Sequence, residues 1–224
     1  MTVLLILFTL ILFLATDHFV QKTRLARARR LAGESVTSAV LTSFGLPENV
    51  GLALNHTWMR EEERGVLTIG VDEFIGRLVG AVEDIVLPHS GAIIAPAFSS
   101  FTLRDGTKQL ELTSPVHGRV VEVNQKVLRN PALARKDPYG EGWLVKIRAD
   151  RAEAARVVTR RGTDAINWLR VQGELAKLFF VNRMPQPALA TMYDGGVAAD
   201  GVLQHFDAEI WREFQTEFTD LRSN

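Results

Sequence analysis

Residues 114–124 read SPVHGRVVEVN, and this stretch decides the fold class. Gly118 lies where a turn would need a positive φ angle. Pro115 lacks an amide donor, so we expect it at an edge or a turn rather than in a central strand. The side chains that can supply a buried face are those of Val116, Val120, Val121 and Val123. The stretch predicts a small, turn-rich β structure.

Short apolar runs separated by Gly, Pro, Asp and Asn continue this pattern on both sides and predict a compact β-barrel or sandwich. Between the first two runs, residues 72–79 predict a helical turn or two, with Asp72 as the N-cap. Trp58 and Trp143 are expected in the core. The runs are Val66–Val71, Ala81–Leu87, Leu110–Leu112, Arg119–Val123 and Trp143–Arg148.

Several motifs occur in one order over residues 56–150, and together they resemble the H protein of the glycine cleavage system. This resemblance implies a barrel-sandwich hybrid of two small antiparallel sheets, so the expected fold class is α+β and mainly β. The motifs are HTWMR at 56–60, IGV at 69–71, LVG at 78–80, LP at 87–88, SPVHGRVVEVN at 114–124, NP at 130–131 and DPYGEGWL at 137–144.

The resemblance also implies where a lipoyl group would be attached, because that family carries lipoate in an amide with a lysine at the tip of a hairpin. The matching position in this chain is Thr107, whose hydroxyl cannot form an amide. Asp105-Gly106 retains a strong signal for a two-residue hairpin. We expect a domain without a covalent cofactor; the alternative is lipoate on Lys108, one residue later and therefore on the opposite face of the hairpin.

Other chemistry is not indicated. The chain has no cysteine, which excludes disulfides and thiolate metal sites. His56, His89 and His117 are widely spaced without a carboxylate at ligand spacing, so we expect no metal site and no catalytic residue. Equal numbers of basic and acidic residues, 26 of each, do not favour nucleic acid as a partner. We expect a protein that is not an enzyme.

The N-terminal residues predict a membrane anchor over 1–21, since residues 3–15 read VLLILFTLILFLA without a charge. A cleaved signal peptide and a buried core helix are the alternatives. Basic residues follow the apolar run, which predicts an N-terminus outside, a cytoplasmic main domain and contact with anionic lipid headgroups. These residues are Lys22, Arg24, Arg27, Arg29 and Arg30. We expect residues 22–55 to form a basic juxtamembrane segment and linker.

Residues 151–224 predict a helical C-terminal extension, broken at Gly162 and Gly173 and again near residues 182–187. A last amphipathic helix over 208–221 carries an aromatic stripe that more often packs inside its own chain than against a partner. The expected buried positions are Ala154, Val157, Val158, Ile166, Leu169, Leu175 and Leu178, and then Ile210, Trp211, Phe214, Phe218 and Leu221.

These features lead to two hypotheses. The first is a single-pass inner-membrane accessory subunit, in which a non-lipoylated H-protein-like domain is the scaffold for other subunits of a photosynthetic or respiratory complex. The alternative is a lipoyl carrier modified at Lys108 and serving a membrane-associated oxidoreductase. A small-molecule or regulatory binding module is a third possibility, although the sequence suggests no polar pocket for it.

Overall fold

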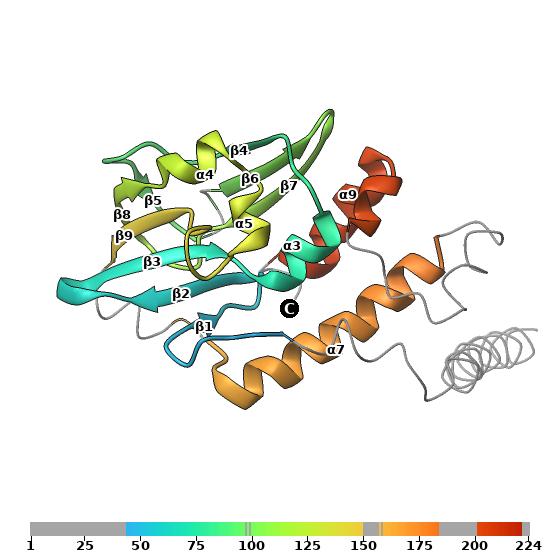
Figure 1. Cartoon of the computed structure of the whole chain (residues 1–224), viewed down its shortest axis with the longest axis horizontal. Helices are drawn as coiled ribbons and strands as arrows, with labels where there is room; N and C mark the ends of the chain where they lie inside the picture. Colours follow the sequence, from blue (N-terminus) through green and yellow to red (C-terminus); the bar gives the residue numbers. More distant parts are fainter. Residues whose placement is uncertain are drawn as a thin grey trace, which may run out of the picture.

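Two antiparallel sheets form the central part of the chain (Figure 1). The computed structural model describes residues 44–96, 98, 100–149, 157, 159–183 and 201–220. The six-stranded sheet has the order β1 (Gly51–Leu52), β2 (Thr57–Glu61), β3 (Val66–Val71), β9 (Val145–Ala149), β8 (Gly118–Val123) and β5 (Ile93–Ile94). The three-stranded sheet has the order β4 (Asp84–Val86), β6 (Ser100–Asp105) and β7 (Lys108–Thr113). The predicted mainly-β sandwich of two antiparallel sheets is therefore confirmed.

Helix α3 (Glu73–Val79) follows β3 directly, and Asp72 ends the strand and caps the helix. The Asp72 carboxylate accepts a hydrogen bond from the Ile75 amide at 3.0 Å, which confirms the predicted N-cap. Its other oxygen lies 2.7 Å from His56 Nδ1, and both side chains are fully buried. The cap thus also closes a buried polar pair at the start of β2.

Gly70 has no room for a side chain, because a Cβ there would lie 2.6 Å from the indole of Trp58. Trp58 is fully buried against this glycine, as predicted, whereas Trp143 is only half-buried. Lys146 Nζ lies 5.0 Å from the centre of the Trp143 ring, in a cation–π contact at the surface. Trp143 is therefore an edge of the core rather than its interior.

Gly118 was predicted to lie in a turn with a positive φ angle, and this prediction is wrong. Gly118 begins β8, and it is not among the described glycines with positive φ. A Cβ there would lie 2.6 Å from the carbonyl oxygen of Arg148 on the adjacent strand, so close backbone approach requires the glycine. Val116 and Val120 are buried as predicted, and Val121 and Val123 are half-buried.

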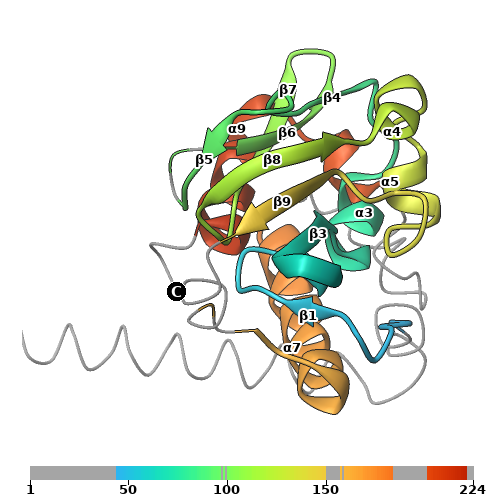
Figure 2. The same cartoon turned by 90° about the vertical axis from the view of Figure 1, so that its left-hand side faces the viewer.

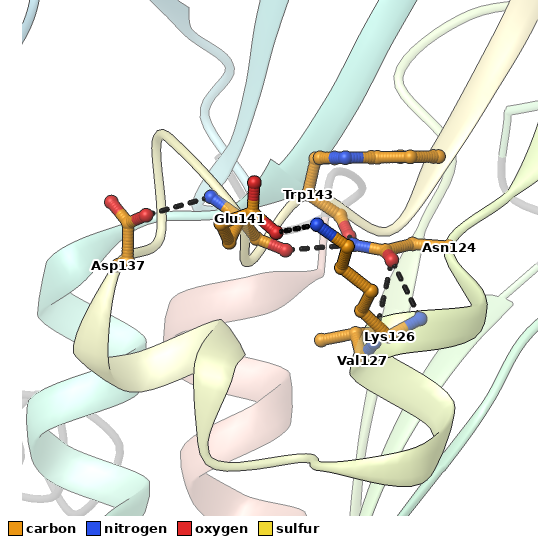
Figure 3. A network of polar contacts seen from close by, with 6 residues as sticks. All are labelled: Asn124, Lys126, Val127, Asp137, Glu141 and Trp143. Atoms are coloured by element: carbon orange, nitrogen blue, oxygen red, sulfur yellow. Dashed lines mark hydrogen bonds and ion pairs between the residues drawn. The ribbon is translucent and has the colours of Figure 1, made fainter.

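Asn124 organises the loop that follows β8 (Figure 3). Its side-chain oxygen accepts from the amides of Lys126 and Val127 and so caps α4 (Gln125–Arg129). Its side-chain nitrogen donates to the carbonyl oxygens of Glu141 at 2.8 Å and Trp143 at 2.6 Å. One side chain therefore joins α4 to the turn after α5 (Leu133–Lys136).

Tyr139 lies in that turn with its hydroxyl against the start of α3, where it accepts a hydrogen bond from the Glu73 amide at 3.3 Å. Burial raises the pKa of the Tyr139 hydroxyl well above its ordinary value, and the nearby Asp72 carboxylate acts in the same direction. The hydroxyl is therefore neutral in the folded protein under conditions where an unfolded chain would ionise it.

The raised pKa predicts a loss of stability in alkali. Stabilisation by the neutral hydroxyl is fully present below the unfolded pKa of about 10 and is lost above it, by about 1.4 kcal/mol per pH unit. Urea unfolding from pH 8 to pH 11 should show this slope above pH 10 in the parent chain and a shallower one there in Tyr139→Phe. Equal slopes in the two proteins would show that Tyr139 does not carry the effect.

The described part of the C-terminal extension is mainly helical, as predicted, and lies against the sheets (Figure 2). It begins beside β1, where the amides of Leu52 and Arg160 each donate to the other residue's carbonyl oxygen at 2.9 Å. The described helices are α7 (Gly162–Val181), η2 (Val202–His205), α9 (Ala208–Phe214) and η3 (Gln215–Thr219). The predicted intramolecular packing of the last helix is confirmed by the burial of Trp211, Phe214 and Phe218.

Helix α7 differs from the prediction in its buried face. Gly173 does not break the helix but lies within it, fully buried. Leu175 and Leu178 are exposed, at 43% and 37% of their surfaces, and were wrongly expected to be buried. The buried positions are Ala165, Leu169, Gly173, Ala176, Phe179 and Phe180, and Ile166 is half-buried. This face combines small residues with the larger side chains of Leu169, Phe179 and Phe180.

Among the described residues, no helix is long and apolar enough to cross a membrane. Residues 1–21, for which the anchor was predicted, lie outside the described residues. The same holds for the basic residues expected to meet lipid headgroups and for Ala154, Val158 and Leu221 of the extension. The predicted domain boundaries, the headgroup contacts and the other subunits expected as partners stay predictions.

Candidate functional site

The β6–β7 hairpin contains both residues that the sequence raised for lipoyl attachment. Its closing pair is Asp105 and Lys108, and the two turn residues are Gly106 and Thr107. Gly106 has a φ of +59°, and a positive φ at the first turn position is the requirement of a type II′ turn. The predicted hairpin is present. Its two turn residues are Gly106 and Thr107, one position later than the expected pair Asp105-Gly106. Thr107 is exposed at the tip.

Lys108 is the first residue of β7 and lies on the same face as Leu110 and Leu112, because side chains alternate along a strand. Those two leucines are buried, and Lys108 is half-buried. Its Nζ donates a hydrogen bond to the carbonyl oxygen of Gln204 at 2.6 Å. The amine therefore faces the C-terminal extension, whereas Thr107 is exposed.

Acidic residues before β4 and at its start fasten the other side of the hairpin. The Glu83 carboxylate accepts from the Gly106 amide at 3.1 Å, and the Glu83 amide donates to the Arg104 carbonyl oxygen at 2.8 Å. The side chains of Arg104 and Asp84 form an exposed ion pair at 3.8 Å. Two of the three residues before Thr107, Arg104 and Gly106, thus hold the turn to β4.

The edge of β7 is covered by the extension at two further points. The Glu111 amide donates to Gln215 Oε1 at 2.8 Å, and the Glu111 carbonyl oxygen accepts from the Thr219 hydroxyl at 3.3 Å. Sequence reasoning missed Gln204, Gln215 and Thr219 as neighbours of the hairpin. They lie 96 to 108 residues away along the chain, and no local pattern signals such contacts.

The three histidines do not come together as a metal site. His56 is fully buried and paired with Asp72, while His89 and His117 are exposed. Within the residues that the structure describes, no group of three or more His, Cys, Asp or Glu side chains could hold a metal ion. His56 is therefore a core residue. Its ring stacks on those of Phe74 and Trp168, with distances between ring centres of 4.3 and 4.6 Å.

Comparison with known proteins places this hairpin in a family context. The family described as "Glycine cleavage H-protein" matches residues 52–165. A glycine cleavage system H protein from Alteromonas mediterranea is 35% identical over 107 residues, which cover 48% of this chain and 83% of that protein. The H protein from Prochlorococcus marinus is 35% identical over 108 residues, covering 48% and 83%.

A solved structure, that of the glycine cleavage system H protein from Mycobacterium marinum, is similar at 24% identity and a TM-score of 0.43. The match covers 46% of this chain and 86% of that chain.

These comparisons contradict two expectations. The expectation of a domain without a cofactor is contradicted, because the relatives are H proteins, a family that carries lipoate on a lysine. The expected location as a single-pass inner-membrane protein is also contradicted by these relatives, which are glycine cleavage system H proteins. H proteins are carriers and not themselves catalysts, which agrees in part with the expectation of a protein that is not an enzyme.

Proposed function

The chain belongs to the glycine cleavage H-protein family, and on that premise we propose that it is a lipoyl carrier whose attachment residue is Lys108. The observation that carries the proposal is the presence of one lysine in the hairpin, directly after the turn where the family's lysine is expected. Thr107 occupies the family's own position and offers a hydroxyl instead of an amine.

The residues present fit the group chemically. The Lys108 amine can form an amide with the carboxyl group of lipoate. A bound lipoyl group would supply a disulfide that accepts two electrons and a sulfur atom that can carry a transferred group. The hairpin would hold the attachment residue at one end of the three-stranded sheet, and Glu83 would fix the turn through the Gly106 amide.

The scaffold role in a membrane complex has less support. The aromatic residues of the last helix, which could have formed a partner surface, are buried within the chain. The indole nitrogen of Trp211 donates to the Leu203 carbonyl oxygen at 2.8 Å. The rings of Phe214 and Phe218 stack with their centres 4.6 Å apart. These side chains are used internally, so they do not argue for a further subunit.

Substitution of the lysine tests the carrier function. The full chain would be incubated with lipoate, ATP and a lipoate–protein ligase, and its intact mass measured. We expect a lipoyl-sized increment in the parent chain, its complete loss in Lys108→Arg, and its retention in Lys136→Arg, a matched change at an exposed lysine of α5. An increment that persists in Lys108→Arg would refute the assignment.

A second variant separates position from chemistry. Thr107→Lys combined with Lys108→Thr moves the amine back to the position that the family uses, at the exposed tip. The parent chain and its Gly201→Ala/Gln204→Ala variant would be incubated with the ligase for the same prolonged time. If the exchanged variant accepts lipoate and neither of these two proteins does, Lys108 is not an attachment site. Peptide mapping would identify the modified residue in each case.

A further inference from the structure

The amine of Lys108 is engaged by a segment from the far end of the chain. Gly201, η2 and Phe206 form a short unit, residues 201–206, that we call the C-terminal latch. It presents the Gln204 carbonyl oxygen to Lys108 Nζ at 2.6 Å. In the view of Figure 1 the latch leads into α9, which lies beside the β6–β7 hairpin.

The latch is fixed to the domain next to the hairpin. The Gly201 amide donates to the Arg77 carbonyl oxygen at 2.7 Å, and the Gln204 side chain donates to the Ala81 carbonyl oxygen. Gly201 and Gly80 both have positive φ, and a Cβ on Gly80 would lie 2.5 Å from the Gly201 Cα. Contacts at the end of α3 thus determine where the Gln204 carbonyl lies.

The segment that continues from the latch covers the edge of β7. Because β7 is an outer strand of its sheet, its Glu111 amide and carbonyl would otherwise be open to another strand or to solvent. Gln215 and Thr219 occupy these groups with side-chain hydrogen bonds. The extension therefore follows β7 from its first residue, Lys108, to its middle.

We infer that the C-terminal latch controls access to the Lys108 amine, so that acylation of Lys108 requires the latch to move away. Acylation forms a bond between Nζ and the carbonyl carbon of an activated donor, while the donor's leaving group and an Nζ proton depart. A half-buried amine held against the Gln204 carbonyl is not oriented for that attack. As a control of lipoyl attachment, the inference rests on the proposed function.

The test measures amine reactivity without lipoate. The full chain is treated with the N-hydroxysuccinimide ester of acetate, and acetylation of each lysine is followed by mass spectrometry, with exposed Lys136 as the internal reference. Gly201→Ala/Gln204→Ala should open the latch, since alanine is strained at a φ of +80° and the bond to Ala81 is lost. We expect the relative rate at Lys108 to rise about tenfold or more.

A matched control changes the same residue types elsewhere. Gly162→Ala/Gln109→Ala also places alanine at a positive φ, +50°, and removes an exposed glutamine side chain, which hydrogen-bonds to Glu111 and not to the latch. It should leave the rate at Lys108 unchanged. Circular dichroism would verify folding of each variant, and Gln204→Ala alone is the milder substitute if the double variant does not fold.

The outcomes separate the two proposals. If Lys108 of the parent chain reacts as fast as Lys136, or if folded latch variants show no acceleration, the latch inference is wrong. If acetylation accelerates but a lipoate–protein ligase modifies neither the parent nor the opened variant, the latch controls the amine and the lipoyl carrier function fails. Acceleration of both reactions in the opened variant would support both.

Discussion

Replacing Asp72 with alanine is expected to lower the free energy of unfolding by about 3–5 kcal/mol, the range for breaking a buried pair by removing one partner. The carboxylate is fully buried and serves two elements, since it caps α3 through the Ile75 amide and pairs with His56 Nδ1 at 2.7 Å. Alanine would leave the cap open and the imidazole without its partner. Urea unfolding followed by circular dichroism measures the loss.

The backbone around His56 adds to this expectation. His56 has a φ of +61°, the one described non-glycine residue in the left-handed region, and its carbonyl oxygen accepts from the Asp72 amide at 3.0 Å. Such a conformation persists because the surrounding structure determines it. The Nε2 atom has no hydrogen-bond partner among the described residues, so the Asp72 contact is the main polar anchor of the ring.

Asp72→Asn is the matched control. Asparagine retains an oxygen for the Ile75 amide and can meet His56 only in one ring tautomer, so we expect a smaller loss of about 1–3 kcal/mol. If alanine and asparagine cost the same, the cap contributes little and the pairing with His56 dominates. A loss below about 1 kcal/mol for Asp72→Ala would contradict the proposed importance of the buried pair.

The central sheets were predictable where short-range patterns determine structure. The run Val66–Val71 matches β3 at both ends, because Gly65 has a positive φ before it and Asp72 caps the helix after it. The hairpin was predictable for a similar reason, because glycine at a turn needs no partner elsewhere in the chain. Such signals lie within a few residues of the element they define.

Other features depend on distant contacts and were missed. Leu175 and Leu178 looked like core residues, but α7 packs through a different face that includes Gly173, Ala176 and Phe180. Hydrophobicity alone cannot choose between two apolar faces of a helix, because the surface that covers one of them comes from distant parts of the chain. The position of Lys108 shows the same limit, because the Gln204 carbonyl that it contacts comes from the extension, 96 residues away.

Trp211→Ala should cost about 3–5 kcal/mol of unfolding free energy, because it empties a fully buried indole site. The indole belongs to an interior that continues from the domain into the extension. There the ring centre of Phe218 lies 6.0 Å from that of Phe74 of α3 and 5.8 Å from that of Phe179 of α7. Trp211 also joins α9 to the latch through its hydrogen bond to the Leu203 carbonyl oxygen. The loss should therefore appear in the unfolding of the sheets as well as the helices.

Trp211→Phe separates packing from the hydrogen bond, since phenylalanine fills much of the site without a donor; we expect a loss of about 1–3 kcal/mol. Far-ultraviolet circular dichroism and the fluorescence of the remaining tryptophans should give coincident transitions for each variant. If Trp211→Ala instead melts the helices while the sheets unfold at the parent midpoint, the extension is a separately folding unit. Coincident transitions at a lower midpoint would mean that the segment that covers Lys108 is part of the same cooperative structure as the hairpin.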